Sequence, residues 1–263
     1  MKAFMTLVIL VCIGTIVYGN YHWNNKLGIT VEGEVSLINH STATAPKVVK
    51  NNIEATGKSL SNLPDALVET LLGKSKSGDV VNVAIIGSEV NALHDTSWTT
   101  IFIKEMERVY DGLFNISVTA VQGEVTTSEV AQRDLHLENF NSKSDIVIIE
   151  PFLLNSNGLI LIDHSLQNIS EIIEELKVEN PNMFIFLQPG QPIHKAIYYP
   201  IDVKALENWT KENGYTYINH WTSWPDYQSD ELQDYVYADS LSPNEKGHEV
   251  WAKHLVNYFT GKE

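Results

Sequence analysis

The sequence predicts an α/β protein, a three-layer sandwich in which a central parallel sheet lies between two layers of helices. From residue 80 onward, short apolar runs alternate with amphipathic stretches, which is the pattern of successive strand–helix units. The stretch DIVII, residues 145–149, is apolar almost throughout, as expected for a strand buried on both faces. A membrane helix is expected to precede this sandwich.

The expected elements can be placed in order along the chain. The helix over 166–176 is the clearest, because its apolar residues recur at helical spacing and Asn180-Pro181 follows them. Ligands of such folds bind beyond the carboxyl ends of the strands, so the chemistry is expected in the loops that follow them. Strands are expected over 80–86, 116–121, 145–149, 183–187 and 215–218, and helices over 97–113, 166–176, 203–213 and 245–259.

The N-terminal residues 1–20 are predicted to be a signal-anchor. Ala3 to Gly19 carries no charged residue and is at the short end of what spans a bilayer. A cleaved secretory signal is the alternative, but no A-x-A-like site follows, and the aromatic residues Tyr21 and Trp23 suit a membrane interface. We therefore expect a single-pass protein of the cell membrane with its domain outside, or a secreted one if the segment is cleaved. Residues 21–75 are interpreted as a stalk and lead-in, and 76–263 as the globular domain.

Composition limits the partners of the protein. The formal net charge is −15, from 33 acidic and 18 basic residues, so the surface repels phosphate backbones and nucleic-acid binding is not expected. The single cysteine, Cys12, lies in the N-terminal apolar segment, so the domain contains no cysteine for a disulfide or a metal site. No nucleotide-binding glycine motif is present, and no cofactor or metal is expected.

Four short motifs occur in order on the predicted elements. The turn GSE, residues 87–89, ends the first strand; QGEVTT supplies Gly123; EPFLLNSNG supplies Asn155; and DSLSPNEKGH, residues 239–248, opens the last helix. Together they resemble the SGNH/GDSL hydrolase family over about residues 80–259. The resemblance implies a flavodoxin-like arrangement of the sandwich.

The same resemblance implies the chemistry of acyl transfer. Ser88 would be the nucleophile, and Asp239 would orient a histidine that takes up the serine proton. Gly123 and Asn155 would donate hydrogen bonds to the developing oxyanion, and one such donor is worth roughly 2.7–4 kcal/mol. Three of these residues have a simpler interpretation as well: Ser88 can cap a tight turn, and Asp239 and Asn155 are common turn residues.

The chain departs from the family pattern at two positions. Glu89 occupies the third position of the turn, where the pattern has serine, and Ser242 stands where the pattern has the catalytic histidine. The base is therefore absent or supplied from elsewhere. His194 and His220 follow predicted strands and are the candidate substitutes, whereas His248 is interpreted as a packing or surface residue of the last helix.

The resemblance thus implies an esterase that acts on an acylated glycan or a small ester, with O-acetyl groups of a cell-envelope glycan of the Gram-positive type as the specific case. The alternative is an inactive SGNH-like domain that binds glycan or an envelope protein, with Trp98, Trp221 and Trp224 as stacking candidates. The acidic pairs Glu89/Glu150 and Asp226/Asp239 leave a glycosidase as a third hypothesis.

Overall fold

The computed structural model describes residues 35–36, 60–138, 140–238 and 241–261. Within this part, six strands form one sheet in the order β1-β3-β2-β4-β5-β6. The strands from β2 to β6 pair in parallel, as expected, and a short edge strand, β1, pairs antiparallel with β3. The strands are β1 (Val35–Ser36), β2 (Val81–Ser88), β3 (Phe114–Val121), β4 (Ile146–Ile149), β5 (Phe184–Leu187) and β6 (Thr216–Tyr217).

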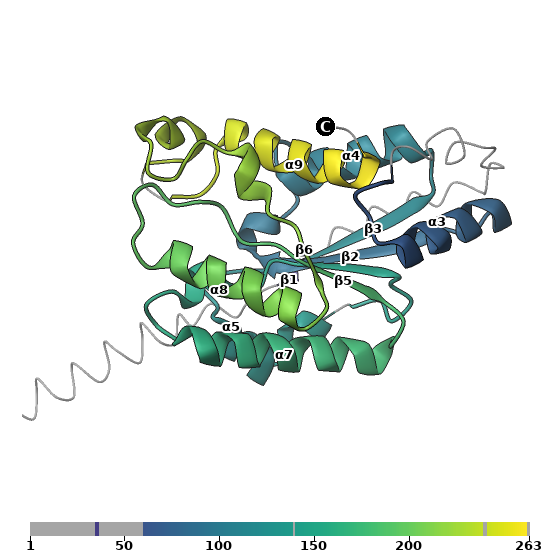
Figure 1. Ribbon diagram of the computed structural model, residues 1–263, viewed down its shortest axis with the longest axis horizontal. Helices are drawn as coiled ribbons and strands as arrows, with labels where there is room; N and C mark the ends of the chain where they lie inside the picture. Colours follow the sequence, from purple (N-terminus) through teal and green to yellow (C-terminus); the bar gives the residue numbers. More distant parts are fainter. Residues whose placement is uncertain (1–34, 37–59, 139, 239–240, 262–263) are drawn as a thin grey trace, which may run out of the picture. The chain divides into compact units, whose positions relative to one another are not determined.

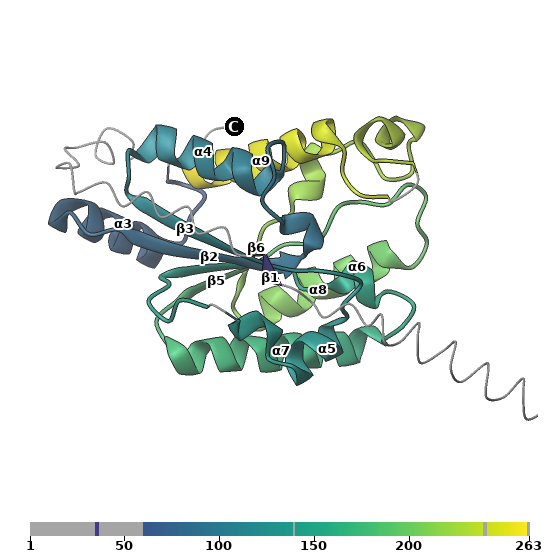
Figure 2. The same ribbon diagram turned by 180° about the vertical axis from the view of Figure 1, so that it is seen from behind.

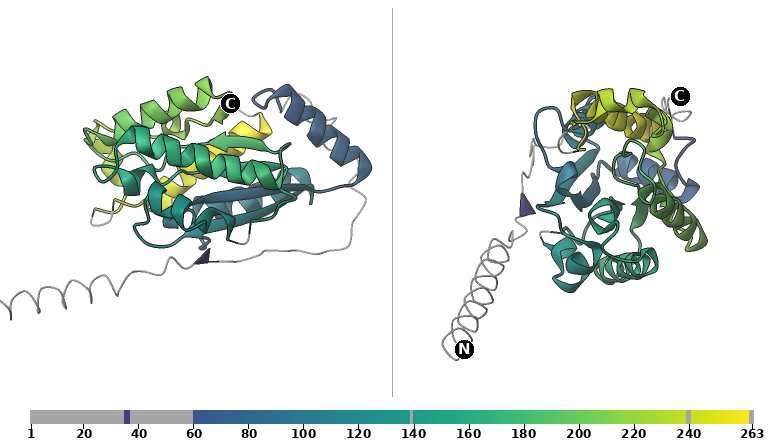
Figure 3. Two further views of the ribbon diagram at one scale, coloured as in Figure 1. Left: turned by 90° about the horizontal axis from the view of Figure 1, so that it is seen from below. Right: turned by 90° about the vertical axis from the view of Figure 1, so that its left-hand side faces the viewer.

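Helices cover both faces of the sheet (Figure 1). On one face lie α3 (Asp65–Ser77), α4 (Trp98–Tyr110) and α9 (Glu245–Thr260), and their apolar side chains share one core. On the other face lie α5 (Thr127–Gln132), α7 (Ile162–Glu179) and α8 (Tyr199–Glu212), which share a second core. Figure 2 shows α5 beside α7, and Figure 3 shows α7 and α8 on the same face. The three-layer sandwich is therefore confirmed.

The strands β2, β3, β4 and β5 supply both cores because successive side chains point to opposite faces. In β2, Val83 and Ile85 pack into the first core, while Ala84 and Ile86 pack into the second. All four are buried, which explains why the sequence of this strand is nearly continuous in apolar residues rather than alternating. Burying each large side chain contributes about 1.5–3 kcal/mol.

The folded unit begins earlier in the chain than residue 76. Leu60, Leu63, Leu67 and Leu71 are buried in the first core, and α3 begins directly after Pro64. Four leucines of the expected lead-in segment therefore pack into this core. Residues 1–20, for which a membrane segment is expected, lie outside the described residues. Among the helices of the described ranges, none is long and apolar enough to span a bilayer.

The start of α9 shows why the last motif has its particular residues. Asn244 is the N-cap, and its side-chain oxygen accepts a hydrogen bond from the backbone N–H of Gly247 at 3.2 Å. Gly247 packs so closely that an added Cβ would clash with the backbone oxygen of Tyr235 and lie 2.9 Å from the ring of Trp224. Asparagine and glycine at these positions therefore fix where the helix begins against the preceding loop.

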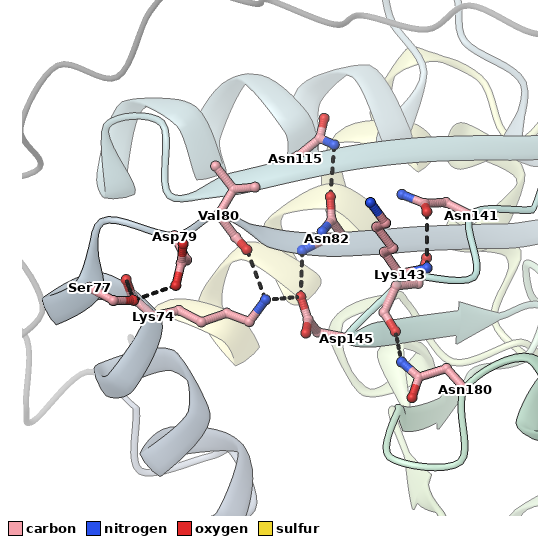
Figure 4. Close-up of polar contacts among 11 residues, drawn as sticks. Lys74, Ser77, Asp79, Val80, Asn82, Asn115, Asn141, Lys143, Asp145 and Asn180 are labelled. Atoms are coloured by element: carbon pink, nitrogen blue, oxygen red, sulfur yellow. Dashed lines mark hydrogen bonds and ion pairs between the residues drawn. The ribbon is translucent and has the colours of Figure 1, made fainter.

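At the amino end of the sheet, a polar cluster ties α3 to the strands (Figure 4). Lys74 Nζ donates to Asp145 Oδ2 at 2.9 Å and to the backbone oxygen of Val80 at 3.0 Å. The same Asp145 oxygen accepts from the backbone N–H of Asn82 at 2.8 Å. One carboxylate thus links a helix, the start of β2 and the start of β4.

We expect Asp145→Ala to lower the free energy of unfolding by about 1–3 kcal/mol, because the partly buried N–H of Asn82 loses its acceptor. Lys74→Met should cost less, since its aliphatic stem is retained. The matched control is Lys204→Met, which removes an ion pair on the solvent-facing side of α8 and should change stability by no more than about 0.5 kcal/mol. Urea unfolding measures all three, and equal effects of Asp145→Ala and Lys204→Met would contradict a structural role for the cluster.

Candidate functional site

A cavity of about 590 Å³ opens at the carboxyl ends of the central strands. This is the edge of the sheet at which parallel α/β folds bind their ligands. Ser88 at the end of β2 and Glu150 directly after β4 line it, together with residues of the loops after β3 and β5 and of the segment before α9. The remaining lining residues are Glu89, Val90, His94, Thr96, Gln122, Glu124, Leu154, Asn155, Gly190, Gln191, Ile193, Tyr237, Leu241, Ser242, Pro243 and His248.

Ser88 and Glu150 form the central contact of this cavity. The Ser88 hydroxyl donates to Glu150 Oε2 at 2.6 Å, and the Ser88 backbone N–H donates to the same oxygen at 2.9 Å. Asn91, in the 3₁₀ helix η1 (Glu89–Asn91), adds a third donor to it at 3.1 Å. Glu150 is 1% exposed, and burial raises the pKa of its carboxyl group, an effect that the bonds from Ser88 and Asn91 oppose.

The register of the sheet explains why these two residues meet. β2 and β4 are neighbours, Ile86 pairs with Ile149, and the backbone N–H of Glu150 donates to the oxygen of Ile86 at 2.8 Å. Gly87 leaves the space that the carboxylate needs, because an added Cβ there would overlap the amide of Asn91 and lie 2.9 Å from Cβ of Glu150. Glycine before Ser88 is therefore a steric requirement of the site.

Gly123, expected as an oxyanion donor, lies beside the cavity but already has a partner. Its backbone N–H donates to Glu89 Oε2 at 3.2 Å, and its φ of 82° is in the left-handed region that favours glycine. The Glu89 carboxylate therefore accepts a hydrogen bond from the N–H group that, by the family resemblance, would donate to the oxyanion.

Asn155, the second expected donor, lines the cavity from α6 (Leu153–Ser156). Its Nδ2 donates to the backbone oxygen of Val125 at 3.1 Å and more weakly to that of Gly123 at 3.4 Å. The amide N–H groups thus brace the loop after β3. Asp239, the expected orienting acid, lies outside the described residues, whereas Ser242 lines the cavity.

The two candidate substitute bases lie outside the set of residues that line the cavity with Ser88. His220 is fully buried: its Nε2 lies 2.8 Å from the backbone oxygen of Pro189, its Nδ1 accepts from Trp224 Nε1, and its ring stacks on Trp251. Burial lowers its pKa to about 3. His194 contacts Asp230 and Gln233 instead. The structure therefore does not bring either residue to Ser88.

The histidines that share the cavity with Ser88 are His94 and His248. His248 was expected to pack rather than to face the site; its Nδ1 does accept from the backbone N–H of Trp98 at 3.2 Å, yet the residue also lines the cavity. Burial lowers its pKa to about 4. The rings of His94 and His248 lie 5.0 Å apart, edge to face. His94 lies in the loop after η1, and no sequence motif identifies it as a site residue.

The tryptophans expected to stack on sugars do not line the cavity. Trp98 is fully buried and stacks on Trp251, and Trp224 is buried as well. Trp221 is half-buried and donates to the backbone oxygen of Gly190 at 2.7 Å. Trp98 and Trp224 are therefore core residues, as most tryptophans are.

No protein-family model matches the sequence, and neither does any curated protein. Solved structures do match at low identity. A lipolytic protein of the G-D-S-L family from Desulfitobacterium hafniense is 15% identical with a TM-score of 0.53, covering 68% of this chain and 99% of its own.

Two further similar structures are esterases by name. A catalytic mutant of an acetylxylan esterase from Geobacillus stearothermophilus is 13% identical with a TM-score of 0.54, over 68% of this chain and 94% of its own. A carbohydrate esterase of family 3 from Talaromyces cellulolyticus is 12% identical with a TM-score of 0.55, over 67% and 95%. The chain therefore has the fold of the SGNH/GDSL hydrolases, as the order of its motifs predicted.

We expect His220 and His248 to stay uncharged in the folded protein as the pH falls from about 7 to about 5, because burial holds their pKa values at about 3 and about 4. The unfolded chain binds protons in this range and the folded chain does not, so stability should fall with the pH. Urea unfolding over a pH series measures the slope, and His248→Gln should make it shallower. Imidazole NMR signals of both residues that titrate near pH 6.5 would contradict the expectation.

Proposed function

We propose that the protein is an esterase that hydrolyses ester-linked acyl groups, with Ser88 as the nucleophile. The observation that carries this proposal is the 2.6 Å hydrogen bond from the Ser88 hydroxyl to the buried carboxyl of Glu150, within a cavity large enough for a small ester. The similarity in fold to lipolytic proteins and esterases supports the same reaction class.

In the proposed reaction, Ser88 Oγ attacks the carbonyl carbon of the ester while its proton moves to Glu150. The tetrahedral intermediate then collapses, the bond to the alcohol breaks, and the alcohol takes up the proton. Water attacks the acylated Ser88 in the same way, which releases the carboxylic acid and restores the hydroxyl. Glu150 thus fills the role that the family resemblance gives to a histidine.

The environment of Glu150 suits it to accept a proton. Among the described residues, Glu150 is the hydrogen-bond partner of the Ser88 hydroxyl. Burial raises the pKa of Glu150 above its ordinary value, although the hydrogen bonds from Ser88 and Asn91 oppose the rise, and a higher pKa makes the carboxylate a stronger proton acceptor. Only the ionised form accepts the proton, so the rate is expected to fall as the pH drops through this raised pKa.

The proposed substrate is an acylated glycan, with O-acetyl groups of a cell-envelope glycan as the specific case. Support comes from two structural neighbours whose names refer to acetylxylan and to carbohydrate esters. The location rests on the apolar segment Ala3 to Gly19, which we propose to anchor the domain outside the cell membrane, or to be cleaved from a secreted form.

We expect a fluorophosphonate probe to form one adduct with the full chain, on Ser88, as mapped by mass spectrometry of the peptides. Ser88→Ala should abolish labelling, and Glu150→Gln should slow it by about 10²–10⁴-fold because the proton acceptor is lost. Ser242→Ala is the matched control, since it removes the other serine of the cavity and should leave labelling unchanged. A folded protein that forms no adduct, or forms one on Ser242, would refute the assignment of Ser88.

A second candidate function is binding without hydrolysis, and one observation favours it. The Glu89 carboxylate accepts from the N–H of Gly123, so this N–H does not face an incoming carbonyl oxygen. Asn155 is likewise engaged with backbone oxygens. A cavity with this arrangement would retain a glycan or an envelope protein segment but stabilise an oxyanion poorly.

Glu89→Ala separates the two candidates. If the protein is an esterase, freeing the N–H of Gly123 should raise kcat on a nitrophenyl ester by up to about 10²-fold, the order of one oxyanion donor. Glu89→Gln is the control, because its amide oxygen still accepts from Gly123 and kcat should change little. If all three proteins are inactive while a glycan binds with the same affinity to each, the binding function holds instead.

A further inference from the structure

We propose that the cavity selects a ligand that carries an ammonium group beside its ester. The inference names the substrate class of the esterase proposed above and rests on that function for the ester, whereas the preference for a cation rests on the cavity alone. It is supported by the charge of the lining, the hydrogen bonding of its amide groups and one buried acceptor without a partner.

The charge of the lining is one-sided. Glu89, Glu124 and Glu150 contribute three carboxyl groups, and the lining residues include no lysine or arginine. Glu124 is exposed and makes no hydrogen bond or ion pair with the other described residues, so its charge is not neutralised within the protein. His248 does not compensate, because its lowered pKa of about 4 leaves the imidazole neutral at pH 7. An anionic ligand would therefore be repelled.

The carboxamides of the lining donate to backbone oxygens of the protein. Gln122 Nε2 donates to the backbone oxygen of Ala120 at 3.2 Å, and Asn155 Nδ2 donates to that of Val125 at 3.1 Å. Gln191 Nε2 donates to the backbone oxygen of Leu241 at 3.3 Å. Each partner is a carbonyl, which can only accept, so the amide orientation is fixed and the amide oxygens are left for the ligand.

Gln191 independently favours a ligand that donates hydrogen bonds. Its side chain is 4% exposed, it lines the cavity, and its Oε1 has no hydrogen-bond partner among the described residues. A buried acceptor without a partner costs about 1–3 kcal/mol. A ligand that brings an N–H to this position removes the cost, which a ligand with acceptors alone does not.

An ammonium group suits the negative lining, the available amide oxygens and the unpartnered Oε1 of Gln191, because it has three N–H donors, no acceptor and a positive charge. It would also favour the ionised form of Glu150, since a nearby cation lowers the pKa of a carboxyl group. Two sources share this chemistry: an amino sugar that bears the ester, or an amino acid that is itself the acyl group. In either case the substrate helps to keep the proposed base in its active state.

Calorimetric titration of the full-length Ser88→Ala variant with two matched pairs of probes tests the inference and the source. Glucosamine and N-acetylglucosamine represent the sugar, and alanine methyl ester and methyl lactate represent the acyl group. The cationic member of one pair should bind at least about tenfold more tightly, an effect of the size expected for charge complementarity in a partly closed site. The pair that shows the preference identifies the source.

Glu124→Gln, tested in the otherwise unaltered chain, should weaken the binding of the cationic ligand about two- to fivefold and leave the affinity for the neutral one unchanged.

Equal binding of the charged and neutral members, tighter binding of the neutral ones, or no binding of any probe would overturn the inference. The titration does not depend on catalysis, so its outcome is separate from that of the proposed function. A cation preference in a protein that resists fluorophosphonate labelling would mean that the esterase proposal fails while the ligand class holds. Thermal unfolding of each variant checks that a lost preference does not reflect a lost fold.

Discussion

The buried carboxyl group of Glu150 is the constraint around which the candidate site is arranged. Removing a carboxylate from water costs several kcal/mol unless hydrogen bonds replace its hydration. Ser88 supplies two donors and Asn91 a third, and all three act on one oxygen. Gly87 must lack a side chain because an added Cβ would overlap the amide of Asn91 and crowd Cβ of Glu150, so the end of β2, η1 and the residue after β4 are determined together.

The space needed around Glu150 also constrains the loop after the neighbouring strand, β5. Gly190, after β5, lies so that an added Cβ would be 3.0 Å from the hydroxyl oxygen of Tyr199 and 3.5 Å from Glu150 Oε1. Burial raises the pKa of Tyr199, and the charge of Glu150 raises it further, so the phenol remains protonated beside the carboxyl group. Gly87 in β2 and Gly190 after β5 therefore both leave space around Glu150, which explains why the chain uses glycine there without a positive φ.

Much of the fold could be predicted from sequence, because the strands are continuously apolar and the four motifs occur in order. The partner of Ser88 could not, because it depends on the register between β2 and β4, which places Glu150 next to the turn. His220 was a reasonable candidate at the end of a strand, yet its ring points into the core against Trp251. Packing decides whether a loop side chain faces the cavity or the core, and no short sequence motif predicts the outcome.

The two departures from the family pattern change the cavity in the same direction. Glu89 adds a carboxylate where the pattern has a neutral serine, and Ser242 removes an imidazole that would carry positive charge during catalysis. Gly123, which the pattern reserves for an oxyanion, instead donates to the carboxylate of Glu89. A lining with three carboxyl groups and no lysine or arginine suits the ammonium ligand proposed above, which would bring positive charge and donors of its own.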